Sequence, residues 1–270
     1  MHHGTVADHA AIRSFVAIGD SFTEGLNDTL PDGALAGWAD RFAATLAQQY
    51  QGVRYANLAI RGRVLDQIVD EQVPVAVAAK PDLIAFSAGG NDLLRAGADV
   101  DATAHRYEQA VRTLRATGAR VLVFTGFDVG STPVLRLARG RIAIYNEHLR
   151  AIADRNACDL VDLWSLTPLR DRRAFSEDRL HLSADGHERV ARLVARVLNV
   201  PAPDPFEGWT GIAAAEPSRR DDLIWARTYF LPWVGRHLRG RSSGDFVLPK
   251  RPELDVLGRV VGAPAEGAGR

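Results

Sequence analysis

The feature that most constrains the fold is the alternation, between residues 15 and 198, of short apolar runs with longer segments of helical apolar spacing. Such alternation is typical of strand–helix units built around a parallel sheet. We therefore predict an α/β fold with three layers and five parallel strands. The strands are expected at residues 15–18, 54–58, 83–87, 121–125 and 160–162. Helices are expected around residues 35–46, 65–69, 107–114, 142–152 and 190–197.

The flanking segments differ from this region. Residues 1–14 lack an apolar pattern and are expected to be flexible, so the main domain spans 15–200. Residues 201–270 are rich in Pro, Gly and Arg, and we expect a C-terminal extension that wraps the domain. Part of 219–238 has helical spacing, and the last ten or so residues are expected to be disordered.

Charge and cysteine content exclude several classes of function. The 33 basic and 33 acidic residues give a formal net charge of zero, so bulk electrostatic binding to nucleic acid or anionic membrane is not expected. No apolar stretch approaches the roughly 18 residues that span a bilayer, so stable membrane insertion is not expected either. The single cysteine, Cys158, excludes an intramolecular disulfide, and no signal-peptide pattern is present, so we expect a cytoplasmic protein.

The first candidate catalytic residue is Ser21, in the sequence Gly-Asp-Ser-Phe-Thr-Glu-Gly directly after the first predicted strand. In an α/β sheet the binding crevice lies at the carboxyl ends of the strands, so a serine there is well placed to react. Taken alone, the same residue could be a helix N-cap.

The second candidate is the pair Asp178 and His181, just before the last predicted helix. A three-residue separation in a turn lets the carboxylate orient the imidazole, which can then act as a general base for a serine. A metal site formed by these two residues and His187 is the alternative, but no further ligands with zinc spacing accompany it. His187 is expected to be structural, and no metal is predicted.

Acyl transfer also requires hydrogen-bond donors for the oxyanion, and two later loops offer them. Gly62 can supply a backbone N–H, and Asn91, in the sequence Gly-Gly-Asn-Asp, can supply a side-chain amide. Each of these taken singly could equally be an ordinary turn residue.

These four blocks, centred on Ser21, Gly62, Asn91 and His181, resemble those of the SGNH (GDSL) hydrolases and occur in the same order. The resemblance covers residues 15–198 and implies a flavodoxin-like sheet. It further implies that Ser21 is the nucleophile, that His181 and Asp178 form the base, and that Ser21, Gly62 and Asn91 form the oxyanion hole.

A second serine pattern occurs in the extension. Residues 240–244 match G-x-S-x-G around Ser242, but no apolar strand precedes them and no His follows, so we interpret them as a flexible turn. The extension also contains basic residues that could hold phosphates or a carboxylate. They are Arg236, Arg239, Arg241, Lys250 and Arg251, near Trp233 and Asp245. The alternative is a solvated charged surface packed by Trp233.

The resemblance implies acyl-serine chemistry, and the acceptor decides the reaction. The PW…RGRSSGD stretch resembles cytosolic bacterial members that include an octanoyltransferase acting on a glucosylglycerate precursor of methylglucose polysaccharide. We therefore expect transfer of a short- or medium-chain acyl group to a sugar hydroxyl, with acyl-CoA as a possible donor substrate and no cofactor. Trp233, Arg236, Arg239 and Arg241 are the expected substrate contacts. The alternatives are a plain carboxylesterase, a carbohydrate esterase or thioesterase, and a non-catalytic sugar-binding module.

Overall fold

A six-stranded sheet forms the centre of the molecule, in the order β5-β4-β3-β1-β2-β6. The computed structural model describes residues 11–131, 135–210, 218–232 and 243–257. Its strands are β1 (Ser14–Gly19), β2 (Arg54–Asn57), β3 (Leu83–Ser87), β4 (Arg120–Phe124), β5 (Asp159–Val161) and β6 (Arg251–Val256). β1 to β5 pair in parallel, which confirms the five predicted strands and their flavodoxin-like order.

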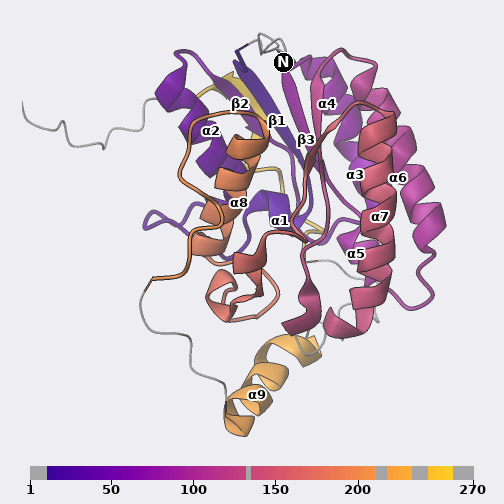
Figure 1. Ribbon diagram of the computed structural model, residues 1–270, viewed down its shortest axis with the longest axis vertical. Helices are drawn as coiled ribbons and strands as arrows, with labels where there is room; N and C mark the ends of the chain where they lie inside the picture. The colour runs from indigo at the N-terminus through magenta and orange to yellow at the C-terminus, as the bar shows by residue number, and fades with distance from the viewer. Residues whose placement is uncertain (1–10, 132–134, 211–217, 233–242, 258–270) are drawn as a thin grey trace, which may run out of the picture.

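Helices cover both faces of the sheet (Figure 1). On one face lie α2 (Trp38–Gln49) and α8 (Ala184–Val197), which pack against each other. On the other lie α3 (Leu65–Glu71), α4 (Val73–Ala79), α6 (Val100–Arg115) and α7 (Arg139–Arg155). Each face buries its own apolar cluster, so the central strands β1, β3 and β4 are buried on both sides, as their continuous apolar runs require.

Short elements connect these helices and strands. The α-helical turns are α1 (Ser21–Glu24) and α5 (Gly90–Leu93), and the extension contains α9 (Arg219–Trp225), which continues into a π-helical turn (Ala226–Phe230). The 3₁₀ turns are Val129–Ser131, Leu135–Ala138, Thr167–Arg170 and Arg172–Ala174. None of the helices in the described part of the chain has the length and apolar character needed to cross a membrane.

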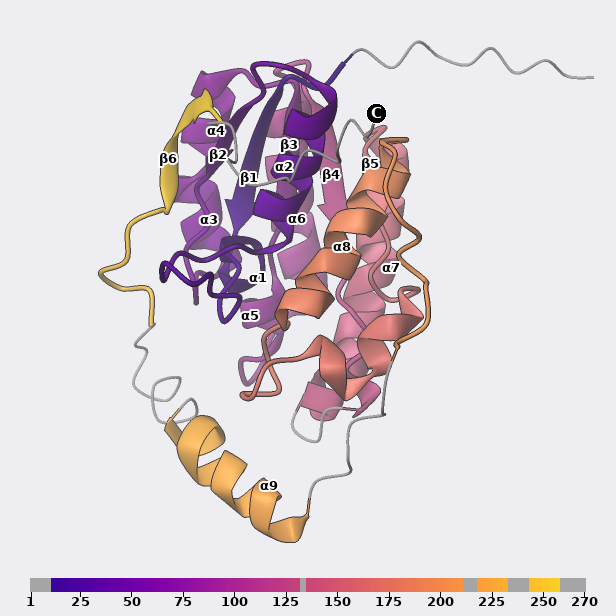
Figure 2. The same ribbon diagram turned by 90° about the vertical axis from the view of Figure 1, so that its left-hand side faces the viewer.

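The prediction of a five-stranded sheet was incomplete, because the C-terminal extension supplies a sixth strand. β6 pairs antiparallel with β2, with Arg54 opposite Val256 and Asn57 opposite Arg251. Pro252 within β6 fits an edge strand, where one side of the backbone has no partner strand. β6 therefore covers the β2 edge of the parallel sheet (Figure 2).

The N-terminal boundary also differs from the prediction. Ile12 is buried, and Asp82 accepts hydrogen bonds from the main-chain N–H groups of Arg13 and Ser14 and from the Ser14 hydroxyl. Residues 12–14 are therefore fixed to the start of β3, and of the segment predicted to be flexible, residues 1–10 lie outside the described part.

Lys250 and Arg251 do not form the solvent-facing basic patch that their sequence neighbourhood suggested. The Lys250 ammonium pairs with the Asp40 carboxylate and donates to the main-chain carbonyls of Glu24 and Leu35. The guanidinium of Arg251 lies over the ring of Tyr55, 5.6 Å from its centroid. Both side chains attach the extension to the domain.

Candidate active site

Ser21 lies at the carboxyl end of β1, as the first residue of α1. The preceding Asp20 caps this helical turn, since its carboxylate accepts a hydrogen bond from the Phe22 N–H at 3.1 Å. The bond fixes the direction of the chain where it leaves the strand. Because Asp20 caps α1, Ser21 is free of the N-cap role that it could have had, and its hydroxyl is available to His181.

His181 lies within hydrogen-bond distance of both other candidate residues. Its Nε2 is 3.0 Å from Ser21 Oγ, and its Nδ1 is 2.6 Å from Asp178 Oδ2. A carboxylate only accepts hydrogen bonds, so Nδ1 donates to Asp178 and Nε2 accepts from the serine hydroxyl. This is the arrangement in which the imidazole can remove the hydroxyl proton.

A tight turn between Phe175 and Leu182 places these two side chains. Asp178 Oδ1 accepts hydrogen bonds from the main-chain N–H groups of Leu180 and His181, both at 2.9 Å. Arg179, between them, adopts a left-handed conformation with φ of 56°, which is rare for a residue with a side chain. The carboxylate therefore organises the same turn that supplies the base.

Two residues that sequence reasoning missed also hold Asp178. The Asn27 amide donates to Asp178 Oδ2 at 2.8 Å, and the Ser176 hydroxyl donates to Oδ1 at 2.8 Å. Asn27 lies 151 positions away in the chain, so no local pattern indicates this contact. The Ser176 contact is local, and a serine two residues before an aspartate is a weak signal that could have suggested it.

The environment of the site shifts two carboxyl pKa values in opposite directions. Burial raises the pKa of Asp178, but the hydrogen bonds and charge of His181 and the N–H of Leu180 outweigh it and hold this pKa well below its usual range. For Asp20, burial dominates over the Phe22 N–H and the His181 charge and raises the pKa to about 6. Asp178 is thus ionised throughout the neutral range, whereas Asp20 changes its charge near pH 6.

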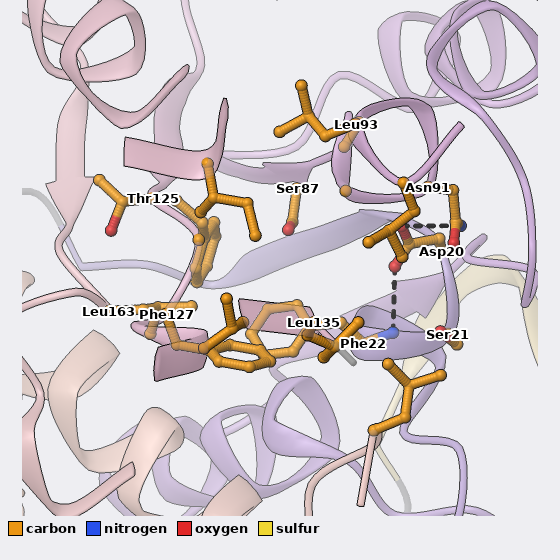
Figure 3. A pocket seen from close by; sticks show the side chains of 18 of the residues that line it. Asp20, Ser21, Phe22, Ser87, Asn91, Leu93, Thr125, Phe127, Leu135 and Leu163 are labelled. Atoms are coloured by element: carbon orange, nitrogen blue, oxygen red, sulfur yellow. Dashed lines mark hydrogen bonds between the residues drawn. The ribbon is translucent and has the colours of Figure 1, made fainter. Parts of the chain in front are cut away.

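The candidate oxyanion donors come from the ends of two neighbouring strands. The Asn91 amide donates to Asp20 Oδ2 at 3.2 Å (Figure 3). It also donates to the Arg63 carbonyl at 2.9 Å. Gly62 follows β2 in a turn with φ of 74°, which favours glycine. Asn91 lines the same cavity as Ser21, while Gly62 lies outside that lining.

A buried ion pair that the sequence did not reveal fixes the Gly62 turn. The Glu24 carboxylate, with 3 % of its side chain exposed, accepts from the main-chain N–H of Arg61 at 2.9 Å and from its guanidinium at 2.6 Å. Glu24 belongs to α1 and therefore joins the serine turn to the turn after β2. The carboxylate is buried and accepts hydrogen bonds from both the main chain and the guanidinium of Arg61, so it holds α1 and the turn after β2 in a fixed relation.

An apolar cavity of about 160 Å³ opens beside Ser21. In Figure 3 Ser21 and Asn91 lie on one side of the cavity, and Thr125 and Leu163 lie on the opposite side. Most of the intervening wall is apolar. It includes Phe22, Leu93, Phe127, Val129, Leu135, Ile142 and Leu182. The cavity can therefore accept an apolar group attached to a carbonyl at the serine.

The proposed metal alternative is not formed. His187 is buried, and its Nδ1 accepts a hydrogen bond from the main-chain N–H of Trp38 at 3.2 Å. Among the described residues, no three side chains of His, Cys, Asp or Glu gather as metal ligands would. The remaining candidates, Ser242 and the substrate contacts Trp233, Arg236, Arg239 and Arg241, lie outside the described residues.

Comparison with known protein families matches residues 17–189, more than half of the chain, to the GDSL-like lipase/acylhydrolase family. The chain belongs to this family. The match begins within β1 and ends within α8, so it contains Ser21, Gly62, Asn91, Asp178 and His181. It excludes the extension with α9 and β6. A search of curated protein sequences gave no match.

Solved structures share the fold at low sequence identity. An acetylxylan esterase, Axe2 from Geobacillus stearothermophilus, is 19 % identical with a TM-score of 0.57, covering 70 % of this chain and 96 % of its own. The lipase Lip_vut3 from a goat rumen metagenome is 20 % identical (TM-score 0.58; 68 % and 96 % covered). A protein named TesA is 23 % identical (TM-score 0.57; 68 % and 97 % covered). This chain is therefore an enzyme of the GDSL-like lipase/acylhydrolase family that shares its main domain with these structures and has an additional C-terminal extension.

Proposed function

We propose that this protein is a serine acyl hydrolase that forms an acyl-enzyme at Ser21. The observation that supports this most strongly is the chain of hydrogen bonds from Ser21 through His181 to Asp178, which opens on an apolar cavity. The family membership and the esterases and lipase among the solved neighbours agree with an ester or thioester substrate.

In the first half-reaction His181 Nε2 removes the Ser21 proton while Oγ attacks the substrate carbonyl carbon. The electron pair of the carbonyl moves to its oxygen, which accepts hydrogen bonds from the Ser21 N–H and from the Asn91 amide, whose N–H turns from Asp20 to the oxyanion. The Gly62 N–H is the third donor that the family resemblance implies, and Gly62 lies outside the cavity lining. When the carbonyl re-forms, the bond to the leaving alkoxide or thiolate breaks and His181 returns the proton to it. Asp178 stabilises the imidazolium and holds its orientation.

In the second half-reaction an acceptor hydroxyl attacks the acyl-serine, and His181 takes its proton. When the carbonyl re-forms, the bond to Ser21 Oγ breaks and His181 returns the proton to Oγ. Water gives the free acid. Transfer to a sugar hydroxyl, for which a glucosylglycerate-type precursor is the acceptor proposed here, is the second candidate. The structural support for the transfer reaction is that α9 binds directly to the turn of Asp178, so the extension lies beside the reacting groups. Trp and Arg side chains of the extension would then exclude water from the acyl-serine.

The cavity suits a short or medium acyl chain. Its volume of about 160 Å³ is several times the space that one water needs, so several carbons of an acyl chain fit beside Ser21. The apolar wall contacts the chain, and the few polar atoms near Ser21 remain for the carbonyl.

The test is hydrolysis of p-nitrophenyl esters from acetyl to dodecanoyl by the full-length protein, compared with Ser21→Ala. We expect turnover to peak at short or medium chains and to fall by about a thousandfold or more in Ser21→Ala. Octanoyl-CoA with glycosides, followed by mass spectrometry of the products, separates hydrolysis from transfer. Free acid alone with every glycoside would exclude the transferase, and full activity of Ser21→Ala would exclude both reactions.

A further inference from the structure

α9 and the π-helical turn that continues it contact the turn that contains Asp178 at three consecutive positions. The Tyr229 hydroxyl donates to the Glu177 carboxylate at 3.1 Å. The Trp225 indole N–H donates to the main-chain carbonyl of Asp178 at 2.9 Å. Arg179, the next residue of the turn, donates to the Asp222 carboxylate at 2.7 Å.

The residues of this segment that make these contacts are Asp222, Trp225 and Tyr229, separated by three and four positions. Residues at this spacing lie on the same side of a helix. Leu223 and Ile224, at other positions of the same helix, are exposed. The segment therefore uses one side to bind the turn.

The turn needs such support at Arg179. Its left-handed backbone costs free energy for a residue with a side chain, yet this conformation brings the N–H groups of Leu180 and His181 to the Asp178 carboxylate. The Arg179 guanidinium lies over the Trp225 ring, 5.1 Å from its centroid, in addition to its ion pair with Asp222. Stacking and ion pairing offset the cost of the backbone conformation.

We propose that α9 is a positioning element for Asp178, the aspartate that orients His181, and that Trp225 is the positioning residue that holds the backbone of Asp178 in place. This inference rests on the proposed function and assigns a role to a segment that lies outside the family match. Both views place α9 beyond the carboxyl ends of the strands, at the same end of the sheet as α1 (Figures 1 and 2).

The proposal predicts that a change in α9 lowers kcat and leaves KM nearly unchanged. The residues of α9 do not line the apolar cavity, and of the turn that they hold only Leu180, His181 and Leu182 do, so most of the acyl site is unaffected when α9 is loosened. It lowers the fraction of molecules in which Asp178 is aligned with His181, and this fraction enters kcat. If α9 only stabilised the fold, a change in it would lower the free energy of unfolding and leave kcat of the folded protein unchanged.

The first experiment compares Trp225→Phe with the wild type in the full-length protein. Phenylalanine keeps an aromatic face for Arg179 and removes the N–H donor. We expect kcat to fall about tenfold, as for the loss of one orienting hydrogen bond, with KM within about twofold. Leu223→Ala, on the same helix at a side chain 71 % exposed, is the matched control and should behave as wild type. An unchanged kcat in folded Trp225→Phe would overturn the proposal.

The second experiment repeats Trp225→Phe in the Asp178→Asn background, measuring the rate at which a fluorophosphonate labels Ser21. Once the Asp178 carboxylate is replaced, its position can no longer affect the labelling rate, so we expect Trp225→Phe to lower that rate no further. A further loss equal to that in the wild type would overturn the proposal. If Trp225→Phe fails to fold, Asp222→Asn takes its place with the same expectations. Full activity of Ser21→Ala would instead overturn the proposed function, whatever Trp225→Phe does.

Discussion

At the scale of single residues, local spacing indicated the reacting groups but not the groups that hold them. Asp178 and His181 are three positions apart in one turn, and a strand end indicated Ser21, so the sequence could suggest all three. Glu24 and Asn27 bind partners 37 and 151 positions away. Contacts at such separations depend on the folded chain, and a single sequence contains no periodicity that marks them.

Asn91 allows a direct test of the proposed oxyanion hole. Replacement of Asn91 by Ala removes the amide while Asp20 still caps α1 through Phe22. We expect kcat for a short p-nitrophenyl ester to fall about a hundredfold, because the amide stabilises charge that exists only in the transition state. KM should change little. A rise in KM with unchanged kcat would show instead that Asn91 contacts the ground-state substrate.

At the scale of elements, apolar runs predicted the buried strands well and the edge strand poorly. β1 and β3 are buried on both sides, and this burial requires the continuous apolar residues that the sequence shows. β6, with sequence RPELDV, is an edge strand whose side chains are partly or fully exposed, so polar residues and Pro252 are compatible with it. Its pairing with β2 joins residues about 200 positions apart, which no local pattern predicts.

The 3₁₀ turn Leu135–Ala138 borders the cavity and permits a test of acyl-chain selection. Leu135 is buried in the cavity wall, so Leu135→Trp should fill part of the space. We expect the preferred p-nitrophenyl ester to become shorter, with acetyl ester activity retained. Leu137→Trp, in the same turn but 82 % exposed, is the matched control and should keep the wild-type chain-length profile. Equal profiles for both variants would mean that the acyl chain binds elsewhere.

At the scale of the whole molecule, the extension is attached to the domain at widely separated places. The Trp209 indole donates to the Pro168 carbonyl, and the guanidinium groups of Arg173 and Arg189 both lie over its ring, 5.0 and 4.2 Å from the centroid. α9 binds the Asp178 turn, and β6 completes the sheet. Gly244 packs so closely on the turn after β2 that a Cβ atom there would overlap the Arg61 carbonyl oxygen. Truncation at residue 201 would therefore weaken the fold as well as alter the site.

Stability should decline on mild acidification because of His187. Burial, followed by the charges of Arg41, Lys250 and His181, lowers the pKa of His187 to about 3 from 6.5. Below pH 6.5 the unfolded chain binds a proton at this residue that the folded chain does not, so stability falls as the pH falls toward 3. Between pH 7 and pH 4.5 this residue should remove about 3 kcal/mol of unfolding free energy.

The measurement is urea unfolding of the wild type and His187→Asn across this pH range. The asparagine carbonyl can accept the Trp38 N–H without titrating. We expect the variant to lose less stability than the wild type on acidification, whatever its stability at pH 7. Parallel pH dependence in the two proteins would show that other groups determine the acid sensitivity.

The central claim is that Ser21, activated by His181 and Asp178, is the nucleophile. The most direct measurement is labelling of the native full-length protein with a fluorophosphonate, followed by peptide mass mapping in the wild type, Ser21→Ala and His181→Ala. The account predicts one label per chain on Ser21 in the wild type, none in Ser21→Ala and slow labelling in His181→Ala. A label on Ser242 or on any other serine, or rapid labelling without His181, would contradict it.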